Sequence, residues 1–193
     1  MLFATPKIFS DIYTNRLILR EPRISDTGDV YEFCSSLDAT RYVDWYPHTD
    51  KYQTAAYIRY LKRQIAIGNT SSYTWLVEQR LDKKVIATIS VTGFDSSGKI
   101  ATVGYTFNRH YQNKGYATEA LLNLMHYLFT KRGVERIEAK VLPENERSIK
   151  LLERVGMKRE ARFKKGVSIK GKLCDVLVYA ILKEEFCGKN TVL

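Results

Sequence analysis

The sequence predicts a single α/β domain of the α+β type, in which a mixed, mostly antiparallel central sheet is flanked by helices. Its length of 193 residues suits one domain, and a hydrophobic content of 45% against 27% charged residues supplies enough apolar surface for a core. The spacing of apolar residues is helical near the N-terminus, becomes typical of strands in the middle, and then alternates between the two. The sequence contains no internal repeat, low-complexity segment or obvious linker, which favours one sheet with helices packed on it.

The first third of the chain is expected to form one strand and two helices. Residues 16–20, Arg-Leu-Ile-Leu-Arg, are typical of a short strand. Ser25 and Asp26 suit the start of a helix that runs towards Leu37. A second helix is expected over about 52–67, where apolar residues recur at helical spacing.

Three strands and a long helix are expected next. Residues 75–79, 85–92 and 100–107 are rich in β-branched and aromatic residues. The turn signals between them, such as Asp-Ser-Ser-Gly at 95–98, predict an antiparallel meander. From about 115 to 131 the spacing is helical again.

The C-terminal third alternates between the two kinds of element. Residues 136–142 alternate apolar and polar side chains, as a strand does, and a short helix is expected over 145–154. The cationic stretch 158–165 is expected to be a solvated loop. An apolar run over 174–183 predicts the last strand.

Charge and cysteine content narrow the functional classes. Lys and Arg outnumber Asp and Glu by 31 to 21, so the net charge is +10 and an anionic partner is expected, whether a nucleic acid, a phosphorylated cofactor or an acidic protein. No run reaches the roughly 18 apolar residues of a membrane span, and the N-terminus lacks the order of a signal peptide. We therefore expect a soluble, cytoplasmic protein with no membrane partner. Neither a metal-binding nor a disulfide spacing connects the scattered cysteines and histidines, which are Cys34, Cys174, Cys187, His48, His110 and His126.

The loop over residues 108–118 joins the last strand of the meander to the long helix. A helix N-terminus offers unpaired backbone N–H groups and the positive end of the helix dipole, so it can bind a phosphate or pyrophosphate. Gly115 would allow a ligand to approach the backbone closely, and the small Ala117 keeps the first turn open. The loop matches neither of the glycine-rich nucleotide-binding patterns, and taken alone it could be an ordinary connection.

Two motifs resemble the signatures of the GCN5-related N-acetyltransferase (GNAT) superfamily. Gln112-x-x-Gly115-x-Ala117 resembles that superfamily's acetyl-coenzyme A pyrophosphate loop, Q/R-x-x-G-x-G/A. Residues 145–157, Asn-Glu-Arg-Ser-Ile-Lys-Leu-Leu-Glu-Arg-Val-Gly-Met, resemble its second signature, N-x-x-S-x-x-x-L-x-x-x-G-F, with Met157 in place of the usual Phe. Either motif alone is weak evidence, whereas the two in this order are specific.

The ends of the chain extend the resemblance. Residues 16–20 and 179–185 are similar to the ends of the RimJ/RimL-like branch, the ribosomal-protein N-terminal acetyltransferases. The resemblance implies a GNAT domain over residues 14–185, an N-terminal extension over 1–13 and a C-terminal tail over 186–193. It also implies an acyltransferase that moves the acetyl group of acetyl-CoA to a primary amine.

The resemblance assigns roles to residues in and beside both motifs. The strand before the loop would line the pantetheine arm of acetyl-CoA, the loop amides would hold the pyrophosphate, and no metal ion is implied. Ser148 would donate a proton to the leaving thiolate, and Asn145 would contact the cofactor, although spacing alone allows an N-cap and a polar helix residue. The cofactor-binding residues expected in this way are Tyr105, Thr106, Phe107, Gln112, Asn113, Lys114, Gly115, Tyr116, Ala117, Thr118 and Asn145.

Neither motif identifies the general base. Many relatives carry Glu in the strand before the loop, where this chain has Thr102, which cannot deprotonate an ammonium group. A water held by the backbone, Glu78, Asp95 or Tyr105 could replace it, or the acceptor amine could have a low pKa. Simpler roles are a solvent-facing strand end or turn residue for Glu78 and Asp95, and a helix-dipole partner for Glu119.

The acceptor is the least determined part of the function. The resemblance favours the N-terminal α-amine of a protein, as in ribosomal-protein-alanine acetyltransferases, over an aminoglycoside, polyamine or amino acid. A non-catalytic module with a basic surface stays open because the strand Glu is missing. A nucleic acid is not favoured as a partner, and both a monomer and a homodimer are compatible with the sequence. An aromatic segment before the second helix could shape the acceptor pocket or anchor the core, and it contains Tyr42, Trp45, Tyr46, Pro47 and His48.

Overall fold

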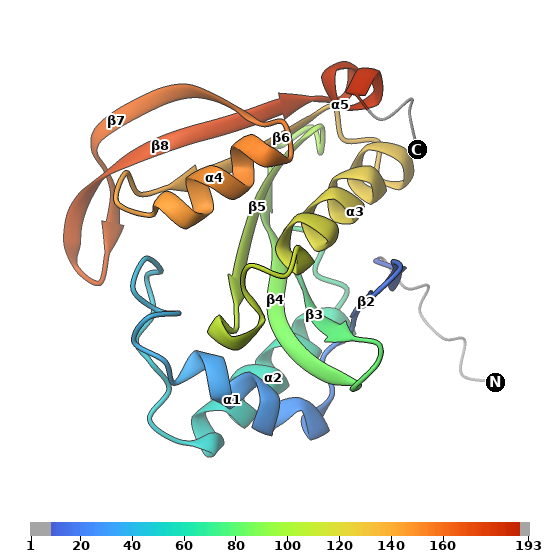
Figure 1. Ribbon diagram of the computed structural model, residues 1–193, viewed down its shortest axis with the longest axis vertical. Coiled ribbons are helices and arrows are strands. Elements are labelled where there is room, and N and C mark those ends of the chain that lie inside the picture. The colour runs from blue at the N-terminus through green and yellow to red at the C-terminus, as the bar shows by residue number, and fades with distance from the viewer. Residues whose placement is uncertain (1–8, 190–193) are drawn as a thin grey trace.

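One sheet of eight strands runs through the computed structural model, which describes residues 9–189, and helices lie on both of its faces (Figure 1). The strand order is β1-β2-β3-β4-β5-β6-β8-β7, and every neighbouring pair is antiparallel except β5 and β6. The expected fold class, a single domain with a mixed, mostly antiparallel sheet, is therefore confirmed.

The strands and helices have the following bounds. The strands are β1 (Ile12–Tyr13), β2 (Leu17–Arg20), β3 (Tyr73–Gln79), β4 (Lys84–Phe94), β5 (Ile100–Phe107), β6 (Arg136–Val141), β7 (Lys158–Ile169) and β8 (Lys172–Leu182). The α-helices are α1 (Thr27–Cys34), α2 (Lys51–Ala66), α3 (Tyr116–Lys131), α4 (Glu146–Arg154) and α5 (Lys183–Lys189), and the short 3₁₀ helices are η1 (Ile24–Asp26) and η2 (Arg109–Tyr111).

Alternating side chains along the central strands supply two separate cores. On one face, Trp75 of β3 belongs to the main core together with Leu121 and Leu124 of α3, all three fully buried. On the other face, the next residue, Leu76, packs in a smaller cluster with Ile58 of α2. Successive strand residues point to opposite faces, so α3 and α2 pack on opposite faces of β3. The expected meander is confirmed by the antiparallel pairing of β3 with β4 and of β4 with β5.

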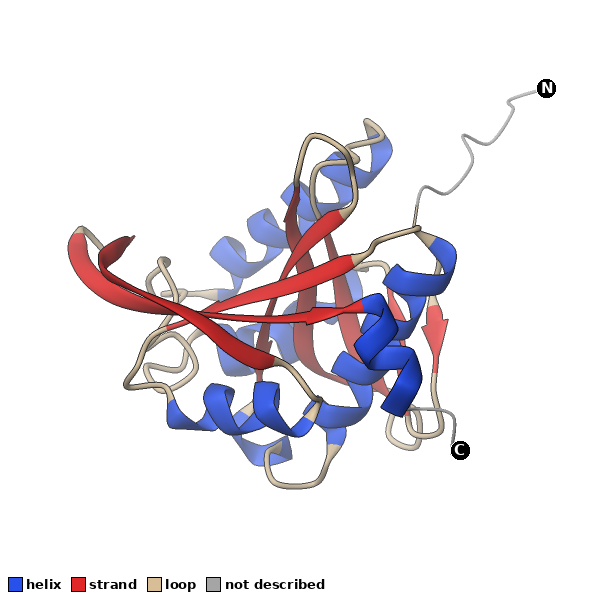
Figure 2. Ribbon diagram, turned by 90° about the horizontal axis from the view of Figure 1, so that it is seen from above, coloured by secondary structure: helices blue, strands red, loops and turns tan. Residues whose placement is uncertain are grey.

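The cationic stretch 158–165 is part of a strand, so the expectation of a loop was wrong. It belongs to β7, the edge strand of a long hairpin that extends away from the rest of the sheet (Figure 2). The alternation that would reveal a strand is broken by register shifts between Arg159 and Ala161 and between Phe163 and Val167. The strand is also exposed along most of its length, which removes the hydrophobic signal.

Both ends of the described chain pack against the domain. Phe9 is buried and contacts Trp75, with ring centroids 5.4 Å apart, and β1 pairs with β2. Phe186 of α5 is buried against Phe129, with ring centroids 5.3 Å apart. Phe9 of the expected extension 1–13 and Phe186 of the expected tail 186–193 therefore contribute to the core, while residues 1–8 and 190–193 lie outside the described range.

Two further findings concern the described residues. Within 9–189, no helix is long and apolar enough to cross a membrane. In the same range, His, Cys, Asp and Glu side chains do not form a group of three or more that could hold a metal ion.

Candidate active site

β5 and β6 separate from each other halfway along their length. Their parallel pairing runs from Ile100 and Arg136 to Val103 and Ala139, where it stops. Residues 104–107 stay paired with β4 on their other side, and the end of β6 stays paired with β8. The two facing edges therefore offer unpaired backbone N–H and C=O groups to a cleft of about 770 Å³ that both strands line.

The structure brings both sequence motifs to this cleft. Lys114 is the one expected site residue that does not line it; its Nζ lies 5.2 Å from the ring centroid of Tyr111. The expected residues that line the cleft are Tyr105, Thr106, Phe107, Gln112, Asn113, Gly115, Tyr116, Ala117, Thr118, Asn145 and Ser148.

The N-terminus of α3 opens into the cleft at Gly115. This glycine is the N-cap residue and has φ +78°, in the left-handed region that favours glycine. Glycine has no side chain that could cap the helix. Within residues 9–189, no side chain forms a capping hydrogen bond at the start of α3. The first-turn amides, together with the positive end of the helix dipole, therefore suit an anion such as a pyrophosphate.

Arg16 and Glu119 tie this loop to the start of β2. Arg16 donates from Nε to Glu119 Oε2 (2.7 Å) and from Nη1 to the carbonyl of Lys114 (2.9 Å), and its guanidinium lies 4.5 Å from the ring centroid of Tyr116. The Thr14 hydroxyl donates to Glu119 Oε1 (2.6 Å). Burial raises the pKa of Glu119, but these hydrogen bonds outweigh burial and the net pKa is lowered. Glu119 is thus a structural anchor as well as a dipole partner, and no local sequence signal connects it to Arg16.

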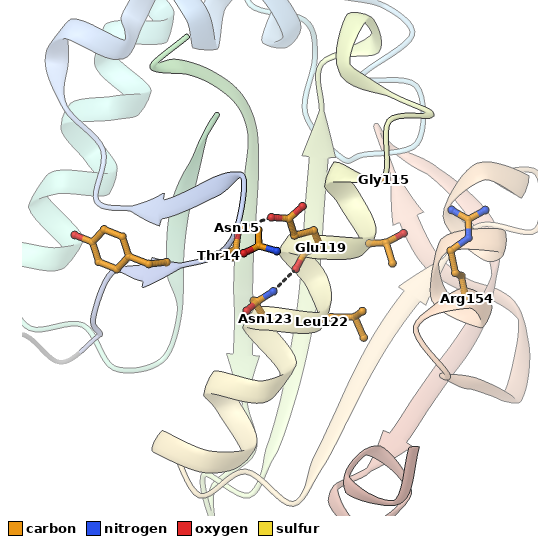
Figure 3. Close-up of a pocket in the computed structure, with 9 residues that line it drawn as sticks. Thr14, Asn15, Gly115, Glu119, Leu122, Asn123 and Arg154 are labelled. Atoms are coloured by element: carbon orange, nitrogen blue, oxygen red, sulfur yellow. Dashed lines mark hydrogen bonds between the residues drawn. The ribbon is translucent and has the colours of Figure 1, made fainter. Parts of the chain in front are cut away.

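A second hollow, of about 760 Å³, adjoins the cleft along α3, between the β1–β2 turn and the end of α4 (Figure 3). It shares Gly115, Thr118 and Arg154 with the cleft. Figure 3 shows Glu119 and Asn123 on α3, with Arg154 across the hollow on α4. The Arg154 side chain forms no hydrogen bond or ion pair with any residue in 9–189, so a cationic group is left to face a ligand.

Ser148 lies in the first turn of α4 and is positioned by two contacts. Asn145 is the N-cap of α4, and its Oδ1 accepts a hydrogen bond from the backbone N–H of Ser148 (3.2 Å). The Ser148 hydroxyl lies 2.7 Å from the hydroxyl of Tyr105, which comes from β5. Burial raises the pKa of Tyr105 to about 12, so its hydroxyl stays protonated. When Tyr105 donates to Ser148, the Ser148 proton is left to point into the cleft.

Two of the carboxylates considered as bases lie away from the cleft. Glu78 is buried in an ion pair with Arg20 (2.6 Å), which also binds Asp26 (2.8 Å). Asp95 lies in the turn between β4 and β5, where hydrogen bonds from Ser97 and the backbone lower its pKa to about 2. The turn role expected for Asp95 is therefore confirmed, whereas the expectation of a solvent-facing strand end was wrong for Glu78, which is buried because it pairs with Arg20.

The aromatic segment before α2 is divided between the core and the cleft. Tyr42 lines the cleft, whereas Trp45 packs against the smaller core cluster. His48 accompanies Trp45, at a ring-centroid distance of 5.6 Å, and burial lowers its pKa. Tyr46 is exposed and lies under Lys170 of the β7–β8 hairpin, whose Nζ is 5.4 Å from the ring centroid.

Arg147 connects this segment to the loop before α3. It donates from Nη1 to Asp38 Oδ2 (3.0 Å) and to Gln112 Oε1 (3.3 Å). Asp38 and Arg147 are 109 positions apart, so no local pattern in the sequence indicates the pair.

Comparisons with known proteins agree with this geometry. The acetyltransferase (GNAT) domain family matches residues 16–158. The uncharacterized N-acetyltransferase p20 of Bacillus licheniformis is 33% identical over 177 residues, which are 92% of this chain and 98% of that protein. A GNAT-family acetyltransferase structure from Bacillus anthracis has a TM-score of 0.80 at 27% identity, over 91% of this chain and 99% of that one. RimL, a ribosomal L7/L12 alpha-N-protein acetyltransferase solved in complex with coenzyme A, shares the fold with a TM-score of 0.77 at 20% identity, over 90% and 98% of the two chains.

Proposed function

The chain belongs to the GNAT family of acetyltransferases, and we propose that it transfers the acetyl group of acetyl-CoA to the N-terminal α-amine of a protein. The separation of β5 from β6, directly beside the uncapped N-terminus of α3, is the observation that carries the cofactor assignment. The free backbone edge of residues 104–107 can pair with the amides of a pantetheine arm, while the α3 amides hold the pyrophosphate. The hollow next to Gly115 then takes the nucleoside end of the cofactor, with Arg154 as the partner of its 3′-phosphate.

Ser148 and Tyr105 supply the chemistry at the thioester. A thioester is already activated, so the enzyme has to place the amine, stabilise the oxyanion and protonate the leaving thiolate. In our proposal the Ser148 hydroxyl gives its proton to the sulfur, and the Tyr105 hydroxyl stabilises the serine oxygen that remains. The contact from Asn145 to the backbone of Ser148 positions the serine for this transfer.

The choice of an α-amine as acceptor rests on the pKa of the amine and on the fold that this chain shares with RimL. An α-amine has a pKa of about 7.7 to 8.0 and is partly neutral at neutral pH, whereas a lysine side chain, at about 10.4, is almost wholly protonated. The strand position that carries Glu in many relatives is Thr102 here, and whichever group takes the proton instead, an amine of lower pKa loses it more easily. RimL, whose fold this chain shares, is named as an α-N-protein acetyltransferase, which supports the same choice.

The test is a matched pair of peptides. One carries a free α-amine and no lysine, and the other has the same sequence with a blocked N-terminus and one lysine; spermidine and an aminoglycoside complete the panel. Release of coenzyme A thiol is measured with acetyl-CoA at neutral pH. We expect the α-amine peptide to be preferred by about tenfold or more, since its pKa is about two units lower. Preference for lysine or a small amine would overturn the acceptor assignment, and no turnover with any amine would overturn the enzymatic proposal.

A further inference from the structure

Glu138 lies beside the gap between β5 and β6, at the level where the two strands begin to separate. In their parallel pairing Glu138 is the partner of Thr102, and the next pair, Val103 with Ala139, is the last before the cleft. Paired residues of neighbouring strands project from the same face of a sheet, so the Glu138 carboxylate and the Thr102 hydroxyl are neighbours. The carboxylate that is missing at Thr102 is therefore replaced by one on the adjacent strand, at the same level of the sheet.

The face that carries Glu138 is the one opposite α3. Ile137 and Ala139, on either side of it in β6, belong to the main core with α3, so Glu138 points to the other side of the sheet. Ser148 and the N-terminus of α3 lie on the α3 side, and under the proposed function acetyl-CoA enters the gap from there. The amine then has to approach the thioester from the face of Glu138.

The Glu138 side chain is partly exposed to solvent, and one of its carboxylate oxygens is fixed by Arg136. α1 and α2 contact the sheet mainly at β4 and β3, and 23% of the Glu138 side chain is exposed. Arg136 donates from Nε to Glu138 Oε1 (2.7 Å), and among residues 9–189 no hydrogen bond to Oε2 is found. One oxygen is thus fixed while the other is available. The charged groups around it are Arg136 and Lys140 on β6 and Lys158 and Glu160 on β7, whereas the neighbours on β5 and β8 are the uncharged Thr102, Ala180 and Leu182.

Glu138 adjoins the cleft through its neighbours Ala139 and Lys140, which line it. The carboxylates that line the cleft itself are placed less well for deprotonating the amine. Asp38 is paired with Arg147. Glu144 and Glu146 lie beside and within the first turn of α4, on the side of the leaving thiolate, and Glu146 is 3.8 Å from Lys150.

We propose that Glu138 is the general base for the acetyl transfer and that it takes the proton of the acceptor ammonium through one water molecule. The freed lone pair of the nitrogen forms the N–C bond with the thioester carbonyl, and the C–S bond breaks as the tetrahedral intermediate collapses. The sulfur takes the proton of Ser148, and the second proton lost by the nitrogen returns to Ser148 through water. Glu138 passes its proton to solvent, so one proton is released for each acetyl group transferred.

The pH dependence of Glu138→Gln tests this role with the α-amine peptide. In the wild-type protein we expect kcat/KM to reach a plateau by about pH 6.5, where the peptide is still an ammonium ion, because Glu138 rather than the solvent removes its proton. In Glu138→Gln the value should be roughly ten- to a hundredfold lower at that pH and should rise with the free amine up to about pH 8. Coenzyme A affinity, measured by calorimetry, should stay within about twofold of wild type, which also reports that the variant is folded.

Matched variants separate catalysis from structure. Glu160→Gln disrupts the same Arg136 ion-pair network from its other end and should keep the wild-type plateau. Adding Thr102→Glu to Glu138→Gln should restore the plateau, because it returns a carboxylate to the neighbouring strand at the same level. Glu138→Asp, which keeps the charge, should also retain it at a reduced rate. A wild-type pH profile in Glu138→Gln, or an equal loss in Glu160→Gln, would overturn the role of Glu138 while leaving acetyl transfer itself intact. A wild-type protein that acetylates none of the amines would instead remove the proposed function on which this role rests.

Discussion

The two sides of the cleft are built in different ways. The cofactor side consists of two short stretches of chain, 104–118 and 145–148, and it offers mainly backbone groups and a helix N-terminus. The acceptor side joins distant segments through single side-chain contacts, such as Arg147 with Asp38 (3.0 Å) and the Lys170 ammonium with the carbonyl of Thr40 (2.7 Å). Backbone groups remain when side chains change, whereas side-chain contacts do not. We infer that the first side determines the reaction and the second determines which amine is acetylated.

Ser148→Ala should give the largest separation between chemistry and binding. We expect kcat to fall by roughly a hundredfold, within a range of about ten- to a thousandfold, because the lost proton is needed only as the C–S bond breaks. Coenzyme A affinity should change little, since Asn145 still accepts from the backbone N–H of residue 148. Tyr105→Phe, which removes the neighbouring hydroxyl, should cost about tenfold by the same reasoning. Wild-type turnover in Ser148→Ala would reduce Ser148 to an ordinary helix residue.

Gly115→Val should weaken cofactor binding while leaving the acceptor side of the cleft unchanged. A Cβ at this position would lie 3.2 Å from the Arg16 guanidinium, and φ +78° is unfavourable for a β-branched residue. Coenzyme A affinity should fall by more than about tenfold, because a side chain blocks the approach to the α3 amides. Gly98→Val is the matched control, since Gly98 has φ +70° but open space around it in a turn away from the cleft. Equal affinity losses in both variants, measured by calorimetry, would mean that strain alone is responsible.

The same contrast explains what the sequence could reveal. Local patterns predicted β3, β4, β5, α3 and α4, because each has a clear hydrophobic period or a capping residue such as Asn145. β7 was missed because its bulges and exposure erase that period. The residues expected at the cofactor side line the cleft, apart from Lys114, because they come from two continuous motifs. Glu138 lies outside both motifs, and Arg147 and Arg154 occupy positions that the second motif leaves unspecified, so their roles depend on strand register and on contacts between remote segments.

Arg154→Gln tests which part of the cofactor lies in the hollow next to Gly115. If Arg154 faces the 3′-phosphate, its removal should weaken coenzyme A binding by about fivefold, the value of one exposed charge-assisted contact of about 1 kcal/mol. Dephospho-coenzyme A, which lacks that phosphate, should bind the wild-type protein and Arg154→Gln alike. An equal loss for both ligands would place Arg154 elsewhere along the cofactor.

Arg147→Ala should have the smallest effect. It removes a side chain that contacts both sides of the cleft, Asp38 on the acceptor side and Gln112 on the cofactor side. Its contact with Asp38 is the shorter of the two, at 3.0 Å against 3.3 Å to Gln112, and the Arg147 side chain is 65% exposed. An exposed ion pair contributes about 0.5 kcal/mol, so KM for the acceptor peptide should rise by about two- to threefold. Coenzyme A affinity should stay nearly unchanged, because in the proposed function backbone groups that do not depend on this side chain hold the cofactor. Lys99→Ala, which removes an exposed ion pair with Glu135 (2.7 Å) at the β4–β5 turn, is the control and should alter neither quantity. A larger change in coenzyme A affinity than in acceptor KM would show that Arg147 serves the loop before α3 and that the two sides are less separate than their construction implies.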